Sequence, residues 1–299
     1  METTIKIAAI QHRSEPGAFK DNLESARALI KQAAEKKAQL VILPELFSIG
    51  YSPNESIFSM GEKITGPTIS WLKEQSRQHK LFLGGGVPLF ENGHLYNRFY
   101  LCDPNGELCG YAQKENGEAY CFKRGEGVYV INTSLGRLGV SICGDSHYSY
   151  VVETLQNLDI DILIMPHAWP TMESGSQDEW EFTEIISEML KVPVIFVNGV
   201  GKMQKMQGIF GKLMTPEKFA LRGRSCMFDA KGKRIGNLDN DPGILVREVA
   251  LGKSSNNKPT VPNYAGWTHP GSNLVRKLII PVDVWLGKRV YERNRLKCR

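Results

Sequence analysis

The sequence predicts an α/β fold in which two sheets stack face to face and helices cover their outer faces. Short, continuous apolar runs alternate with amphipathic ones through most of the chain, a pattern typical of sheets covered by helices. Two hairpin sequences, 98–111 and 225–235, lie about 126 residues apart, and each turn begins with Asp and ends with Gly. The repeated order indicates two similar halves, each with its own sheet.

The first half alternates apolar strands with amphipathic helices. The expected strands are 5–11, 39–45 and 81–89, and the expected helices are 21–38 and 66–80. In the first helix the apolar side chains recur on one face, and Asp21 or Asn22 is placed to cap its start. The second helix is expected to open at Thr68.

The second half repeats this alternation and then changes character. The expected helices are 151–158 and 178–190, and the expected strands are 161–169 and 192–199. A further hairpin, 128–143, turns near Leu135 and Gly136 and leads directly into Cys143. From 251 to 271 the chain is rich in Ser, Asn, Pro and Gly, which is typical of a linker. We therefore expect a domain over 1–250, followed over 251–299 by a linker and a tail that packs on the domain or on a partner subunit.

Composition and charge indicate a globular protein and bear on whether it binds nucleic acid. The chain has 299 residues, 41% hydrophobic and 23% charged, which is ordinary for a globular protein. Its net charge is +5, but the segment from Arg276 onward carries eight Lys and Arg against two acids, so only the tail is basic. A nucleic-acid partner is not expected, because that would call for a basic stripe on the folded body.

The sequence also bears on compartment and cofactors. No apolar run approaches the roughly 18 residues of a membrane span, and the start reads as a strand rather than a signal peptide, so no membrane partner is expected. The six cysteines have no CxxC spacing that would indicate a metal site or an iron–sulfur cluster. We expect a cytoplasmic protein without metal or cofactor.

Three ionisable or nucleophilic side chains follow predicted strands, where function usually emerges in layered α/β folds. Glu45 follows the strand in LVILPELF, Cys143 ends the strand in RLGVSICGDSHY, and Lys114 lies eight residues beyond the turn glycine Gly106. Each also has a purely structural interpretation. The glutamate could form an edge salt bridge, the thiol could be buried and inert, and the lysine could be solvated.

Together the three residues supply what acyl transfer to a cysteine requires. Glu45 could take the thiol proton, while Lys114 and the backbone N–H of Gly144 could stabilise the negative charge that develops on oxygen. A nearby ammonium would also favour the thiolate of Cys143. A Cys–His pair with His147 or His167 is the competing arrangement.

In order and spacing, these motifs resemble the Glu-Lys-Cys triad of the nitrilase superfamily of carbon–nitrogen hydrolases. The motifs are Glu45 in LPELF, Lys114 after the DPNGE turn and Cys143 in GRLGVSICGD. The resemblance extends from about residue 4 to 250 and includes IKIAAIQH, RGRSCMFDAKG and VIFVNGVG.

This resemblance implies a four-layer α-β-β-α sandwich of two mixed sheets that pairs as a homodimer or higher homo-oligomer, with C-terminal segments that often cross to the partner. It implies that Cys143 is the nucleophile, Glu45 the general base and Lys114 the transition-state stabiliser, with no cofactor. Glu118 matches the second glutamate that many members carry near the lysine, where it positions the triad or the attacking water.

The chain departs from the family pattern at several positions. Gly144 follows the cysteine where many members have an aromatic residue, Ser149 and Tyr150 replace a common Pro-Glu, and Gln113 and Glu115 flank the lysine. These departures leave the chemistry intact but undermine a subfamily assignment.

Candidate substrate contacts follow by analogy with the family. They are Gly144, His167, Trp169, Tyr51 and Tyr120.

The sequence therefore favours an amidase acting through a thioester on a small linear amide or N-carbamoyl compound. A nitrilase that converts a nitrile to acid and ammonia needs the same triad, and so does a transferase that passes the acyl group to an amine. A catalytically silent binding or scaffold protein would keep the fold and the pocket.

Overall fold

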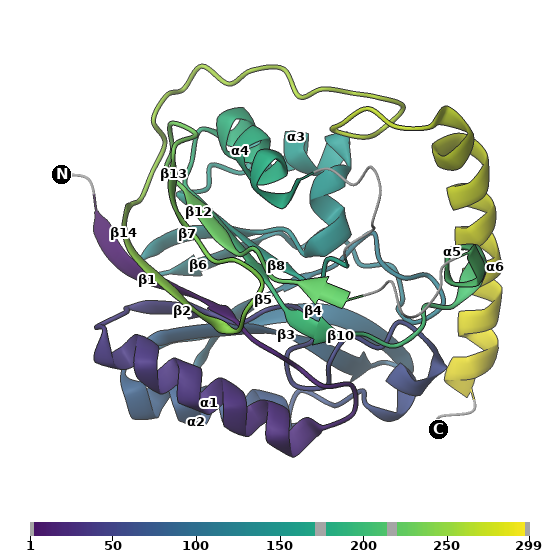
Figure 1. The fold of residues 1–299 in the computed structure, drawn as a ribbon, viewed down its shortest axis with the longest axis horizontal. Coiled ribbons are helices and arrows are strands. Elements are labelled where there is room, and N and C mark those ends of the chain that lie inside the picture. The colour runs from purple at the N-terminus through teal and green to yellow at the C-terminus, as the bar shows by residue number, and fades with distance from the viewer. Residues whose placement is uncertain (1–2, 171–177, 214–219, 297–299) are drawn as a thin grey trace.

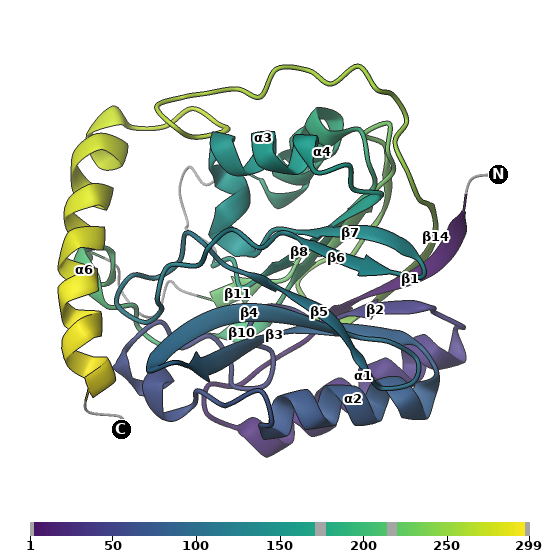
Figure 2. The ribbon, with the colours of Figure 1, turned by 180° about the vertical axis from the view of Figure 1, so that it is seen from behind.

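Two stacked sheets with helices on both outer sides make up the molecule (Figures 1 and 2). The computed structural model describes residues 3–170, 178–213 and 220–296. The predicted four-layer α-β-β-α sandwich is confirmed.

The first sheet has the strand order β14-β1-β2-β3-β4-β5. Its strands are β1 (Thr4–Gln11), β2 (Leu40–Ile42), β3 (Phe82–Glu91), β4 (His94–Cys102), β5 (Leu108–Gln113) and β14 (Gly243–Ala250). Strands β1, β2 and β3 are parallel, and β14, β4 and β5 run antiparallel to their neighbours. Helices α1 (Phe19–Glu35) and α2 (Pro67–His79) connect the parallel strands and cover the outer face.

The second sheet has the order β13-β12-β9-β8-β7-β6. Its strands are β6 (Val130–Thr133), β7 (Gly136–Val140), β8 (Ile162–His167), β9 (Val194–Asn198), β12 (Cys226–Phe228) and β13 (Arg234–Asn237). Helices α3 (Ser149–Asn157) and α4 (Glu179–Leu190) connect its parallel strands and cover its outer face.

The two sheets repeat one pattern of strand directions. Each has three parallel central strands, an antiparallel strand on one side, and an antiparallel hairpin on the other. The hairpins β4–β5 and β12–β13 occupy equivalent places, as the sequence predicts. The two sheets differ in where the strand beside the parallel strands comes from in the chain. In the second sheet this edge strand is β6, which directly precedes β7. In the first sheet it is β14, which comes from the end of the domain.

Alternation along the strands separates the apolar layers. Ile7 of β1 faces the other sheet and packs in one layer with Ile164 of β8 and Val197 of β9. Its neighbour Ala8 faces outward and packs with Ile30 of α1. This period of two is what a sheet covered on both faces requires.

Two helix starts differ from the predicted ones. Helix α1 begins at Phe19, with Ala18 in the cap position and no side-chain cap, so the predicted capping by Asp21 or Asn22 is wrong. Asn22 is instead buried, and its amide bonds the backbone of Glu15 and donates to the carbonyl of Ser48. Helix α2 begins at Pro67, whose fixed φ suits the first helical turn.

The hairpin between β3 and β4 was not predicted. Its turn is Asn92-Gly93, and both residues have positive φ, 50° and 76°. Asn-Gly is a strong signal for a two-residue hairpin, so the sequence contained the information.

The remaining elements lie at the ends of the sandwich. They are the 3₁₀ helices η1 (Glu55–Ser59) and η2 (Cys143–His147), strands β10 (Val200–Lys202) and β11 (Ala220–Arg222), helix α5 (Gly208–Leu213), the π-helix η4 (Val275–Ile279) and helix α6 (Ile280–Arg295).

The chain after β14 crosses outside α3 and α4 and ends in α6, which stands along one end of the sandwich (Figures 1 and 2). Helix α6 packs on its own domain, because Tyr291 is buried and its hydroxyl accepts a hydrogen bond from the Leu95 N–H at 3.0 Å. Within the described part of the chain, no helix has both the length and the hydropathy needed to cross a lipid bilayer.

Candidate active site

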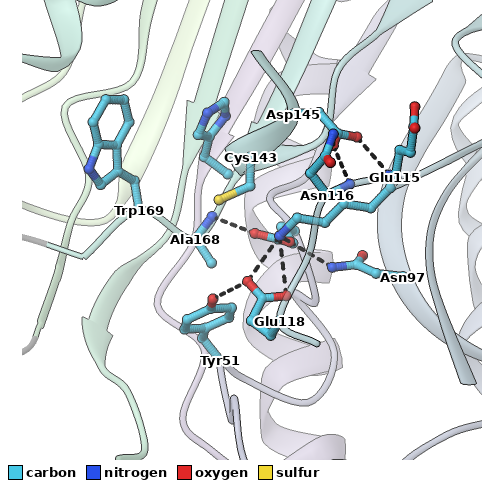
Figure 3. Close-up of polar contacts among 12 residues, drawn as sticks. Tyr51, Asn97, Glu115, Asn116, Glu118, Cys143, Asp145, Ala168 and Trp169 are labelled. Carbon is cyan, nitrogen blue, oxygen red and sulfur yellow. Dashed lines mark hydrogen bonds and ion pairs between the residues drawn. The ribbon is translucent and has the colours of Figure 1, made fainter. Parts of the chain in front are cut away.

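Glu45, Lys114 and Cys143 each follow a strand and meet at one end of the sandwich. Glu45 lies in the turn after β2, Lys114 follows β5, and Cys143 opens η2 just after β7. Both sheets therefore supply the site, as expected where strands of stacked sheets end on the same side. Figure 3 shows the surrounding polar contacts, with the Cys143 sulfur pointing toward the backbone of Ala168.

A buried ion network lies at the centre of the site. The Lys114 Nζ donates to Glu45 Oε1 at 2.8 Å and to Glu118 Oε1 at 3.0 Å. The side chains of Lys114 and Glu45 are only 2% and 0% exposed, so these charges are shielded from water. Buried charges persist when they are paired and hydrogen-bonded, and each of these groups has several partners.

Unusual backbone conformations place two of the side chains. Cys143 and Leu46, the residue after Glu45, have φ of 47° and 51°, in the left-handed region that non-glycine residues rarely adopt. The turn at Glu45 also packs directly on β3. A Cβ at Gly86 would lie 2.8 Å from the Glu45 Cα and 2.7 Å from the Leu46 nitrogen. The GGG run in β3 thus permits the close approach of this turn.

Burial and charge act in opposite directions on these groups. Burial disfavours the charge of Lys114, but Glu118 and Glu45 outweigh it and hold the pKa of Lys114 well above its usual value. Burial also opposes ionisation of Glu118, yet Lys114 and the Tyr51 hydroxyl lower the pKa of Glu118. For Glu45, burial prevails and raises the pKa, with Lys114 and Asn97 partly offsetting it.

The Cys143 thiol is protonated in this environment. Burial and the Glu45 carboxylate raise the pKa of Cys143, and the opposing effects of Lys114 and the Ala168 N–H are smaller. Lys114 lowers the pKa of Cys143, as expected of a nearby ammonium, but burial and the carboxylates of Glu45 and Glu118 outweigh this effect. A cysteine in this setting needs a base that removes its proton during attack.

Asp145, whose role was not predicted, joins the nucleophile turn to the lysine loop. Its buried carboxylate accepts hydrogen bonds from the N–H of Glu115 at 3.0 Å and of Asn116 at 2.6 Å. Burial raises the pKa of Asp145 to about 7, and these hydrogen bonds oppose that rise. The only signal in the sequence is an acidic residue two positions after the cysteine.

Two further contacts hold the carboxylates. The buried Asn97 of β4 donates to Glu45 Oε1 at 2.6 Å, and the Tyr51 hydroxyl donates to Glu118 Oε1 at 2.5 Å. Asn97 was missed, although an amide at an inward position of an apolar strand was a usable signal. Tyr51 was predicted as a substrate contact, and the structure places its hydroxyl on Glu118.

The two histidines that could pair with the cysteine lie in different surroundings. His147 packs against Phe182 and Trp169, with ring centroids 4.5 Å and 4.9 Å away, and burial lowers its pKa well below the usual value. His167 donates through its Nδ1–H to the Met165 carbonyl at 3.1 Å, and burial lowers the pKa of His167 to about 3. Both rings are therefore neutral and weak bases. Glu45, in contrast, acts directly on the thiol: among the charged neighbours of Cys143, it raises the pKa of the thiol most.

The other predicted substrate contacts lie around this centre. The Trp169 N–H donates to Asn198 at 2.8 Å and its ring packs near His167, whereas Gly144 lies in the first turn of η2 with the Asn116 carbonyl nearby. Tyr120 is 9% exposed, and its hydroxyl donates to Asp283 of α6 at 2.9 Å. Residues 171–177, which follow Trp169 closely in the chain, lie outside the described residues.

The described residues contain no group of three or more His, Cys, Asp or Glu side chains arranged to hold a metal ion. The five cysteines in the described ranges are free thiols.

Relatives identified by sequence carry amidase and nitrilase names. The chain is 29% identical to an omega-amidase of Xenopus laevis over 55% of this chain and 63% of that protein. It is 30% identical to a nitrilase of Pyrococcus abyssi over 55% of this chain and 67% of that protein. A probable nitrilase of Schizosaccharomyces pombe is 25% identical over 86% of this chain and 92% of its own.

Solved structures share the fold. A carbon–nitrogen hydrolase of Helicobacter pylori superposes with a TM-score of 0.72 at 22% identity, covering 83% of this chain and 89% of that one. An amidase of a Nesterenkonia species, crystallised with an acetamide moiety covalently added at its active-site cysteine, gives a TM-score of 0.70 at 21% identity, covering 82% and 90%. The family model described as carbon-nitrogen hydrolase matches residues 6–256, and the chain therefore belongs to the carbon–nitrogen hydrolase family.

Proposed function

We propose that this protein is a cysteine-dependent amidase that hydrolyses a small linear amide or N-carbamoyl compound through a thioester on Cys143. The observation that carries the proposal is the contact of Lys114 with Glu45 at 2.8 Å and with Glu118 at 3.0 Å, in a buried network whose charges act on the Cys143 thiol. Paired carboxylates around one ammonium, beside a thiol on a strained turn, suit nucleophilic catalysis better than fold stability.

In the first stage, the Cys143 sulfur attacks the amide carbon while Glu45 accepts the thiol proton. The carbonyl π electrons move to oxygen, and the Lys114 ammonium and the Gly144 N–H are the donors available to that oxygen. The raised pKa of the thiol makes the base necessary, because little thiolate exists beforehand.

In the second stage, the tetrahedral intermediate collapses. The carbon–nitrogen bond breaks, the amine or ammonia leaves with the proton returned by Glu45, and a thioester remains. Glu45 then takes a proton from water as its oxygen attacks the thioester, and the proton passes to the departing sulfur. One carboxyl thus acts as base and acid in turn.

Glu118 acts in this scheme by fixing the lysine. It accepts hydrogen bonds from Lys114 and from Tyr51, so it holds the ammonium between two carboxylates. His167, Trp169, Tyr51 and Tyr120 are proposed to border the substrate. For Tyr51 and Tyr120 this contact would involve the ring, since each hydroxyl is already bonded within the protein.

Two features beyond the reaction belong to the same proposal. The expected setting is the cytoplasm, where the free thiols would stay reduced. The expected assembly is a homodimer or higher homo-oligomer, which light scattering of the purified protein would measure.

The proposal is tested with a panel of small amides, carbamoyl-amino compounds and nitriles, followed by intact mass of the protein. Turnover of an amide with a mass increase on wild type that is absent from Cys143→Ala would support it. Cys109→Ala is the matched control, because that partly buried cysteine lies away from the catalytic network. Equal turnover by wild type and Cys143→Ala would overturn the proposal.

A nitrilase is the second candidate, because the Pyrococcus abyssi relative carries that name. The panel separates the two functions: a nitrilase releases acid and ammonia from a nitrile and leaves the amides intact. A silent scaffold would turn over neither class of compound.

A further inference from the structure

Helix α6 packs on the protein through one face only. On that face Gly287 lies against the Ala119–Tyr120 segment, Tyr291 is buried, and Asp283 accepts hydrogen bonds from the Tyr120 hydroxyl at 2.9 Å and the Ile209 N–H at 2.7 Å. Val290 and the buried Asn294 lie on the same inward face.

Residues 273–274, η4 and α6 form one uninterrupted helix, and its opposite face, here called the outer face of α6, carries large apolar side chains that are exposed to solvent. Leu274, Leu278 and Trp285 are 62%, 56% and 52% exposed. Val282 and Leu286, 41% and 37% exposed, extend the same stripe. The spacing of four residues from 274 to 282 is helical, so these side chains form one continuous strip. A strip of this kind marks an interaction site rather than scattered surface residues.

Cations flank the strip. Residues 274–296 contain six Lys and Arg but only two acids. Lys277, Lys288, Arg289 and Arg293 are exposed, and the Arg289 guanidinium lies 3.7 Å from the Trp285 ring centroid.

The two acids leave Lys277, Lys288, Arg289 and Arg293 to set the charge of the outer face. Asp283 is engaged with Tyr120, and Glu292 pairs with Arg295. Lys123, on the neighbouring loop, lines the same pocket as Lys288 and extends the cationic surface.

We propose that this outer face of α6 binds an anionic lipid surface, with the helix lying flat in the headgroup region. An apolar strip with a tryptophan, bordered by Lys and Arg, is the composition of helices that lie in a membrane interface. The helix stands on the outside of one end of the sandwich, so a flat surface can reach its full length (Figures 1 and 2).

A second copy of the chain fits this face less well. In a twofold pairing, the apolar strips of two copies would meet, and the Lys and Arg side chains that flank each strip would meet as well. Like charges would then face each other at the border of the contact. An anionic surface matches both parts of the face at once.

This proposal departs from the expectation of no membrane partner. That expectation rested on the lack of a spanning segment, which does not bear on surface binding. The proposal is also independent of the amidase reaction, because the outer face of α6 holds none of the residues assigned to catalysis.

The test is co-sedimentation of the full chain with vesicles of phosphatidylcholine alone and of equimolar phosphatidylcholine and phosphatidylglycerol. We expect binding to the anionic vesicles only, weakened by salt. Lys288→Gln with Arg289→Gln should weaken binding roughly thirtyfold, at about fivefold for each cation near the surface. Leu278→Ser with Trp285→Ser should weaken it by about tenfold or more.

Matched controls replace exposed residues elsewhere. Ile64→Ser, at a position 45% exposed, controls for the loss of an apolar side chain, and Lys20→Gln with Lys231→Gln controls for the loss of charge. Thermal melting and amide turnover without vesicles should be unchanged in all variants, which separates this proposal from the amidase assignment.

Two outcomes would overturn the proposal. One is no binding of the wild type to anionic vesicles, or equal binding to neutral ones. The other concerns the double variant Leu278→Ser with Trp285→Ser. If light scattering showed that this variant is a monomer where the wild type is a dimer, and its vesicle binding were unchanged, the face would be assigned to a second copy.

Discussion

The backbone N–H of Ala168 donates to Glu45 Oε2 at 3.0 Å. Ala168 follows β8 of the second sheet, and Glu45 follows β2 of the first. This hydrogen bond therefore ties the ends of both sheets together at the candidate active site. The same N–H also lies near the Cys143 thiol, where it favours the thiolate. The position of Glu45 thus depends on how the two sheets stack, and changes around it should alter activity.

Loss of the Asn97 amide should change the pH dependence of turnover. Its hydrogen bond lowers the pKa of Glu45, so Asn97→Leu should raise that pKa. The acidic limb of the kcat/KM profile should then move to higher pH, because the base must be ionised to accept the thiol proton. The shift is measured by comparing the pH dependence of kcat/KM for Asn97→Leu with that for the control Asn256→Leu, at an exposed position. An unmoved limb would show that Glu45 is not the titrating base.

Removal of the Tyr51 hydroxyl should weaken catalysis without unfolding the protein. Tyr51→Phe deletes one donor to Glu118, which raises the pKa of Glu118 and loosens its hold on Lys114. A hydrogen bond to a charged group contributes about 1.5–3 kcal/mol, so kcat should fall by about tenfold or more. The comparison is steady-state kinetics of this variant and of Tyr264→Phe, at a position 49% exposed. Equal kcat values for the two variants would contradict the role given to Tyr51.

A methyl group at Gly86 should both destabilise the fold and displace the base. The added Cβ would lie 2.8 Å from the Glu45 Cα, too close for either backbone to remain in place. Overpacking of this kind costs about 1–3 kcal/mol, and Gly86→Ala should lower the free energy of unfolding by that amount. Denaturant unfolding and amide turnover would report the two effects.

Gly243→Ala in β14 is the matched control for Gly86→Ala. A Cβ there would meet only the tips of Leu238 at 3.9 Å. If Gly86→Ala kept the stability and turnover of this control, the close packing of β3 on the Glu45 turn would not be required.

Asp145 should make stability depend on pH in a defined window. Burial raises its pKa from 3.8 to about 7, so the folded state binds a proton that the unfolded state has already lost. The contribution of Asp145 to the free energy of unfolding is most favourable below pH 4. It is lost as pH rises toward 7, at about 1.4 kcal/mol for each pH unit.

Asp145→Asn cannot titrate and should gain stability relative to wild type across that window. Urea unfolding of both proteins at several pH values between 4 and 8 gives the difference. A constant difference would mean that the backbone hydrogen bonds from Glu115 and Asn116 fully offset the burial of the carboxylate.

The sequence by itself determined the two-sheet sandwich and the three side chains at strand ends. Apolar alternation is a local property, and it predicted most strands and helices because burial acts on each segment. Residues such as Glu45 and Cys143 could be chosen because a polar group directly after a buried strand must emerge at the edge of a sheet. Local signals were less reliable at the ends of elements, as at Asn22, whose side chain holds a loop instead of capping a helix.

Only the tertiary structure decided which ionisable groups lie close enough to interact. Lys114, Glu45 and Glu118 meet only after the sheets stack, and the protonation of Cys143 follows from their combined field and burial. Asn97 and the Ala168 N–H became partners of Glu45 for the same reason. Electrostatic energies depend on distance and on exclusion of water, and both arise from packing between segments far apart in the chain.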